Sequence, residues 1–231
     1  HWTPRQAGIN AHPVRGRGPS NAMLRFQIFG IPVQVQPWFW LTLAIIGGGI
    51  SANSPQLVLA LGLFMIAGFV SILVHELGHA LSGKAFGAPT AITLEAFGGY
   101  ASFPGNAFTR TQDFLVTAAG PFAQAILGAA FLAIDLFVEM PNAATQSFVT
   151  NVWLISFFWA VINLIPVIPL DGGRLLDAIL GPKRRNITLW ISIISAIGFG
   201  LFLFLRFHSF LFPVFLGFMA YQNWQVLKFR R

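Results

Sequence analysis

The sequence His75-Glu76-Leu77-Gly78-His79 lies inside an apolar run that extends from Pro55 to about Gly87. Because glycine is the only helix breaker in this run, we predict one long helix of about 48 Å, which exceeds a bilayer core of about 30 Å. Each ionisable group near the centre of such a helix costs about 2.5–3.5 kcal/mol on insertion scales. Three of them within five residues therefore require a compensating partner, and a metal ion is the partner that the spacing favours.

The spacing of these ionisable residues suits metal chemistry. His75 and His79 are four residues apart and share one helix face, so both imidazoles can bind one ion, while Glu76 can act on water beside it. The chain contains no cysteine, so any further ligand has to be histidine or a carboxylate. Zinc accepts such ligands tetrahedrally and keeps one position open for water. We therefore expect one zinc ion per chain, the alternative being a chance occurrence of the pattern.

The composition places the chain in a membrane. Of 231 residues, 55% are hydrophobic and 9% are charged, and the mean hydropathy is +0.70. A typical soluble domain has about 25% charged residues, so a water-soluble globule is excluded. We predict an all-α multi-pass membrane protein with six transmembrane helices and small β-strand or hairpin elements at the cytoplasmic membrane edge. The strands are expected within 24–36 and 90–103, and the spans at about 37–50, 55–87, 114–138, 148–165, 187–205 and 210–226.

The basic residues indicate the orientation. Outside the first 22 residues, ten Lys and Arg side chains fall on one side of the predicted spans and only Arg206 falls on the other. Because basic loops remain in the cytoplasm, we expect both termini there. We expect the protein itself to lie in the plasma membrane of a prokaryote. The net charge of +7 then reflects topology, and no nucleic-acid partner is expected. Residues 1–22 are expected to be an artificial or disordered leader, and 23–231 a single membrane-embedded domain.

A third ligand is expected from the segment Asn163-Leu164-Ile165-Pro166-Val167-Ile168-Pro169-Leu170-Asp171-Gly172-Gly173-Arg174. Its two prolines interrupt a helix, and its two glycines permit sharp turns directly after the carboxylate. Irregular backbone at membrane depth is tolerated where it lines a cavity, so Asp171 is the natural third ligand. The alternative is an ordinary interfacial turn capped by Asp171.

Together these motifs resemble the site-2 proteases, a family of intramembrane zinc metalloproteases, here in a minimal form without PDZ or CBS domains. The resemblance rests on the His75–His79 motif, on Phe97-Gly98-Gly99, on Ala119-Gly120-Pro121 and on the segment 163–174. It implies a hydrolase that cleaves peptide bonds within or near transmembrane segments of membrane-protein substrates. By this resemblance the zinc ligands are His75, His79 and Asp171, the general base is Glu76, and Asn163 holds the substrate or oxyanion. Gln124 departs from the family pattern, which has asparagine at that position.

A helical substrate has to be unwound before its carbonyls can be attacked. The stretch with Phe97, Gly98, Gly99 and Tyr100 is suited to pairing with an extended substrate strand, the alternative being a hairpin that merely dips into the membrane. The expected partners are thus a transmembrane substrate and the lipid bilayer. A non-proteolytic metal-binding membrane protein or transporter is the competing function, and it would not need a base such as Glu76 beside the ligands.

Overall fold

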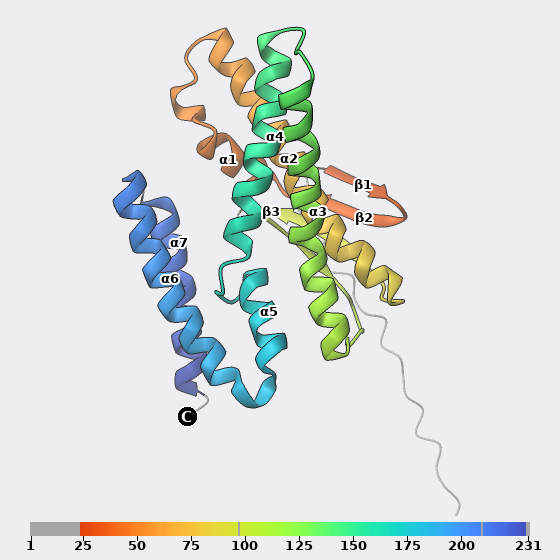
Figure 1. The fold of residues 1–231 in the computed structure, drawn as a ribbon, viewed down its shortest axis with the longest axis vertical. Helices are drawn as coiled ribbons and strands as arrows, with labels where there is room; N and C mark the ends of the chain where they lie inside the picture. Colours follow the sequence, from red (N-terminus) through yellow and green to blue (C-terminus); the bar gives the residue numbers. More distant parts are fainter. Residues whose placement is uncertain (1–23, 97, 209, 230–231) are drawn as a thin grey trace, which may run out of the picture.

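The computed structural model describes residues 24–96, 98–208 and 210–229. Within these ranges the chain is mostly helical and contains one small sheet (Figure 1). The α-helices are α1 (Pro37–Ile46), α2 (Pro55–Ala85), α3 (Arg110–Phe137), α4 (Ala143–Asn163), α5 (Asp171–Leu180), α6 (Arg185–Phe207) and α7 (Leu211–Phe229). The strands are β1 (Leu24–Ile28), β2 (Ile31–Val35), β3 (Ala91–Glu95) and β4 (Gly98–Ser102), and the 3₁₀ turns are η1 (Gly49–Ser51) and η2 (Pro182–Arg184).

The long helices begin at recognisable caps. Ser54 accepts a hydrogen bond from the Leu57 amide at the start of α2, and Pro55 occupies the first helical turn, where its missing N–H costs nothing. At the start of α3, Thr109 and Gln112 form a reciprocal capping box. These caps fix where α2, which carries His75, Glu76 and His79, and the neighbouring helix α3 begin.

Four helices in the described part of the chain are long and apolar enough to cross a membrane. They are the segments Pro55–Ala85, Arg110–Phe137, Ala143–Asn163 and Pro182–Arg206. Large apolar side chains such as Phe122, Phe137 and Ile194 point outward and are 66–84% exposed, as expected of a surface that contacts lipid. The prediction of a helical membrane protein is confirmed. Of the six predicted spans, four meet these criteria of length and composition in the described part of the chain. The first predicted span corresponds to α1, whose 10 residues reach about 15 Å.

The sheet has the order β1-β2-β3-β4, with β2 and β3 parallel and the two outer pairs antiparallel. The alternating stretch 24–36, expected as one strand, forms two strands because Phe29 and Gly30 both adopt positive φ and reverse the chain. One face of the sheet is apolar: Ile31, Val33 and Val35 of β2 are buried with Ile92 and Leu94 of β3. This face packs against α1 and α2 in one hydrophobic cluster, which holds β4 beside the centre of α2.

The remaining helices pack in two groups, one with α2 and one formed by α6 and α7. Helix α3 packs along both α2 and α4, while α6 and α7 pack on each other (Figure 1). The short helix α5 follows the irregular segment after α4 and contacts α3 and α6. This arrangement brings the start of α5 to the middle of α2, although the two are far apart in the sequence.

Candidate metal centre and active-site cavity

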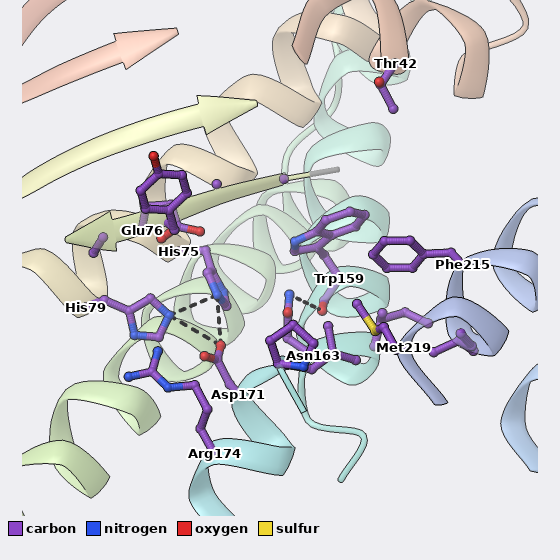
Figure 2. A pocket seen from close by; sticks show the side chains of 18 of the residues that line it. Thr42, His75, Glu76, His79, Trp159, Asn163, Asp171, Arg174, Phe215 and Met219 are labelled. Atoms are coloured by element: carbon purple, nitrogen blue, oxygen red, sulfur yellow. Dashed lines mark hydrogen bonds and ion pairs between the residues drawn. The ribbon is translucent and has the colours of Figure 1, made fainter. Parts of the chain in front are cut away.

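Three ligand-type side chains converge between α2 and α5 (Figure 2). The Nε2 atoms of His75 and His79 lie 3.1 Å apart. The Oδ2 atom of Asp171 lies 3.0 Å from the first of these nitrogens and 3.3 Å from the second. All three residues are buried. Zinc bonds of about 2.0–2.1 Å at tetrahedral angles place ligand atoms about 3.3 Å apart, so the three atoms already have the separations of a metal-binding triangle.

The hydrogen bonds on the outer side of the imidazoles determine which nitrogens face the centre. The Nδ1 atom of His79 lies 2.8 Å from the backbone oxygen of Val116, and that of His75 lies 3.0 Å from Oε1 of Gln124. Both partners are acceptors, so each Nδ1 carries the proton and donates it. The Nε2 lone pairs are therefore left free for a metal.

The centre consequently contains three acceptor atoms with no proton between them. Two imidazole lone pairs face the carboxylate of Asp171, whose buried Oδ2 makes no hydrogen bond in the described structure. Such a cluster is unfavourable in a buried site unless a cation occupies it. This donor set, two imidazoles and one carboxylate with a cavity on the open side, fits a catalytic zinc ion.

Glycines make the close approach of the surrounding elements possible. A Cβ atom on Gly120 of α3 would lie 2.2 Å from Nε2 of His79, and one on Gly78 of α2 would lie 2.4 Å from the backbone oxygen of Ala119. At the start of α5, a Cβ atom on Gly172 would lie 2.1 Å from the backbone oxygen of Leu164. The Gly-Gly pair after Asp171 therefore allows this helix to begin directly against the broken end of α4.

Glu76 lies beside the ligands at the wall of a cavity of about 300 Å³. It is 4% exposed, and Gly99 of β4 is packed against it, since a Cβ atom there would come 2.7 Å from its Cγ. Among the residues anticipated from the sequence, those that line this cavity are His75, Glu76, His79, Gly98, Gly99, Tyr100, Asn163 and Asp171. Phe97 lies outside the described residues. The structure thus brings every described candidate to one cavity.

Other cavity residues were given no role by the sequence, although Arg174 ends the segment 163–174 that carries the family resemblance. Trp159, Arg174 and Met219 line the cavity (Figure 2), as do residues of α1 and α7. Arg174 is held by an ion pair of 3.3 Å with Asp113 of α3. Apolar side chains such as Trp159 and Met219 resemble those of any membrane helix, so the sequence alone could not separate them from lipid-facing positions.

The chain is similar in sequence to known zinc metalloproteases. Residues 134–205 match the profile of peptidase family M50. A Synechocystis protein that is provisionally named a zinc metalloprotease is 34% identical over 183 residues, which cover 75% of this chain and 48% of that protein. A zinc metalloprotease of Methanocaldococcus jannaschii is 33% identical over 159 residues, which cover 68% of this chain and 45% of that protein. The chain therefore spans about half the length of these two curated relatives.

The fold is also similar to a solved structure. The site-2 protease from Methanocaldococcus jannaschii superimposes with a TM-score of 0.61 and is 28% identical in sequence. The match covers 87% of this chain and 94% of that one. It therefore includes most of this chain.

Proposed function

Because residues 134–205 match peptidase family M50 and the fold is similar to that of a site-2 protease, we propose that this chain belongs to that family and is an intramembrane zinc metalloprotease. It hydrolyses peptide bonds within or near transmembrane segments of membrane-protein substrates. The observation that carries this proposal is the buried triangle of His75, His79 and Asp171, which lies beside Glu76 in a cavity between apolar helices. Two curated relatives with zinc-metalloprotease names support the metal and the reaction class.

The residues that would hold zinc are His75, His79 and Asp171. When bound there, zinc polarises the scissile carbonyl and lowers the pKa of a water molecule to about 7. The hydrogen bonds at Nδ1 of both histidines keep their Nε2 atoms directed at this position. Asp171 is fixed by its place as the first residue of α5.

Glu76 acts as the general base. Its carboxylate accepts a proton from the attacking water and later transfers it to the leaving amine. Burial in the cavity wall against Gly99 leaves the side chain little freedom, so the carboxylate is oriented before the substrate arrives. This preorganisation reduces the entropic cost of the reaction.

Asn163 binds the substrate or the oxyanion in this proposal. It is the last residue of α4, and its Nδ2 donates one hydrogen bond of 3.1 Å to the backbone oxygen of Trp159. An amide nitrogen carries two hydrogens, so a second donor remains for a substrate oxygen in the cavity. The bond to Trp159 holds the amide in one orientation while it does so.

The substrate is held as an extended strand against β4. β4 is an edge strand of the sheet in the described residues, so one of its edges has no strand partner there. Gly98, Gly99 and Tyr100 lie on the cavity wall close to Glu76, and we include the neighbouring Phe97 in the same binding element. Pairing with this edge would expose a carbonyl that a helical substrate hides in its own hydrogen bonds.

The protein is an integral membrane protein. We retain the proposal that α1 and α7 join the four long apolar helices as membrane-crossing segments, with the site nearer the cytoplasmic side and both termini in the cytoplasm of a prokaryotic cell. The excess of Lys and Arg on that side supports this orientation. The single domain proposed for residues 23–231 and the leader proposed for 1–22 complete this organisation.

The test of the proposed function is cleavage of transmembrane substrates by the purified full chain in liposomes. A panel of single-span proteins is incubated with the parent protein and with Glu76→Gln. We expect the parent to cut at least one of them inside or beside its membrane segment and the variant to leave all of them intact. Cleavage at equal rates by both proteins would contradict the role of Glu76, and metal transport without cleavage would favour a transporter.

A further inference from the structure

We propose that Gln124 is a positioning residue of the metal centre, which fixes the tautomer and ring orientation of His75 through a buried chain of hydrogen bonds across three helices. The proposal rests on the metal centre of the proposed function. It adds a residue outside the ligands and the base, supplied by the middle of α3.

The chain of hydrogen bonds is continuous and buried. Oε1 of Gln124 lies 3.0 Å from Nδ1 of His75, and Nε2 of Gln124 donates to Oγ of Ser71 at 2.9 Å. Oγ of Ser71 lies 3.0 Å from Oγ of Ser156 on α4. Gln124, Ser71 and Ser156 are each 0% exposed. A polar network with so little contact with water is retained only when its members satisfy one another.

The directions of the hydrogen bonds made by Gln124 follow from a group that can only accept. Nε2 of Gln124 also lies 3.4 Å from the backbone oxygen of Ser71. Because a carbonyl cannot donate, the NH₂ group of the amide faces Ser71 and the amide oxygen faces His75. His75 must then donate from Nδ1, and the Nε2 lone pair is directed at Asp171 and the metal position.

The two histidines are held by different kinds of acceptor. His79 donates to the backbone oxygen of Val116, which is present whatever side chain stands at that position. His75 depends on the side chain of Gln124. Without this acceptor the neutral imidazole can carry its proton on either nitrogen, and the Nε2–H form cannot bind a metal through Nε2. Gln124 therefore selects the ligand form of one histidine and leaves the other unaffected.

The test compares metal binding by the purified full chain and three variants. Gln124→Met removes the acceptor at similar volume. Gln124→Glu in its neutral form keeps an acceptor oxygen for His75 and an O–H donor for Ser71. Ser156→Ala shortens the chain of hydrogen bonds at its far end and leaves the contact between Gln124 and His75 intact, so it controls for a general packing defect.

The readouts are the zinc affinity from competition with a chelator, the visible absorption spectrum of the cobalt(II)-substituted protein, and the thermal midpoint of the metal-free protein. We expect Gln124→Met to bind zinc about 10–100-fold more weakly and to show an altered cobalt spectrum. Its metal-free midpoint should stay close to that of Ser156→Ala. Gln124→Glu should restore most of the affinity and the parental spectrum, which a purely structural role of Gln124 would not predict.

Parental zinc affinity and an unchanged cobalt spectrum in Gln124→Met would overturn the proposal, as would an equal loss in Ser156→Ala. A parent protein that binds neither zinc nor cobalt would overturn the metal centre itself and the role of Gln124 with it. A parent that binds metal but cleaves no membrane substrate would contradict the proposed protease, and the affinity comparison would still decide the role of Gln124.

Discussion

The backbone of Gly120 lies directly against the imidazole of His79, so that a Cβ atom on Gly120 would come 2.2 Å from Nε2 and 2.3 Å from Cε1 of the ring. Helix α3 thus leaves a space that the ring of His79 fills. We predict that Gly120→Ala displaces the ring and weakens zinc binding by at least about 10-fold. The measurement is chelator competition. Gly62→Ala on α2 is the control, because nothing lies within 4 Å of its added methyl group. Equal affinities in both variants would contradict the prediction.

Asp171 is proposed as the third ligand because it closes the triangle with the two Nε2 atoms. We predict that Asp171→Ala loses most of its bound zinc, measured as metal content after purification and dialysis. Asp177→Ala, on the same helix but paired with Arg185, should keep its zinc. Full retention of zinc by Asp171→Ala would require another third ligand.

Substitution of Glu76 and substitution of the proposed metal ligands should have different effects, because the proposed base does not bind the ion. We predict that Glu76→Gln retains zinc and loses cleavage by at least about 100-fold, the lower range for a general base. In the parent, removal of the metal with a chelator should abolish cleavage, and added zinc should restore it. A Glu76→Gln protein that cleaves near the parental rate would rule out this residue as the base.

Gly98 begins β4 with φ of +129°, and a Cβ atom there would lie 3.2 Å from Trp159. We predict that Gly98→Ala disturbs this edge and slows cleavage of a stable helical substrate about 10-fold. A substrate that already contains helix-breaking residues should suffer less, since part of its unwinding cost is met. The control is Gly105→Ala, which also has positive φ but has nothing within 4 Å. Equal effects of Gly98→Ala on both substrates would argue against a role of β4 in holding unwound chain.

The proposed topology can be tested with single cysteines, because the chain has none of its own. Ser51 lies in η1, after α1, and Lys183 lies in η2, before α6; both residues are exposed. We predict that a membrane-impermeant thiol reagent labels Ser51→Cys only from outside the cell and Lys183→Cys only from the cytoplasmic side. The opposite pattern would invert the orientation, and labelling of both from one side would change the number of spans between them.

Much of the helical framework could be predicted from the sequence, because apolar runs bounded by Ser54-Pro55 and similar caps carry a local signal. The hairpin of β1 and β2 could not, since its reversal depends on positive φ at Phe29, an unusual residue for that conformation. At the site, the pairing of His75 and His79 could be predicted, because their four-residue spacing is a local feature of the sequence. Asp171 could be anticipated from the prolines and glycines around it. The partnership of Gln124 with His75 could not, because it joins residues 49 positions apart on different helices.

The division of the proposed ligands between α2 and α5 also sets the order in which the centre can form during synthesis. Asp171 follows His79 by 92 residues in the chain. At translation rates of about 5–20 residues per second, roughly 5–18 s separate the appearance of the second histidine from that of the carboxylate. During this interval the nascent protein carries the proposed base and two imidazoles without the proposed third ligand. A protease of other membrane proteins would thus remain inactive while its own neighbouring segments are still being inserted, and it would mature only once α5 has docked against α3.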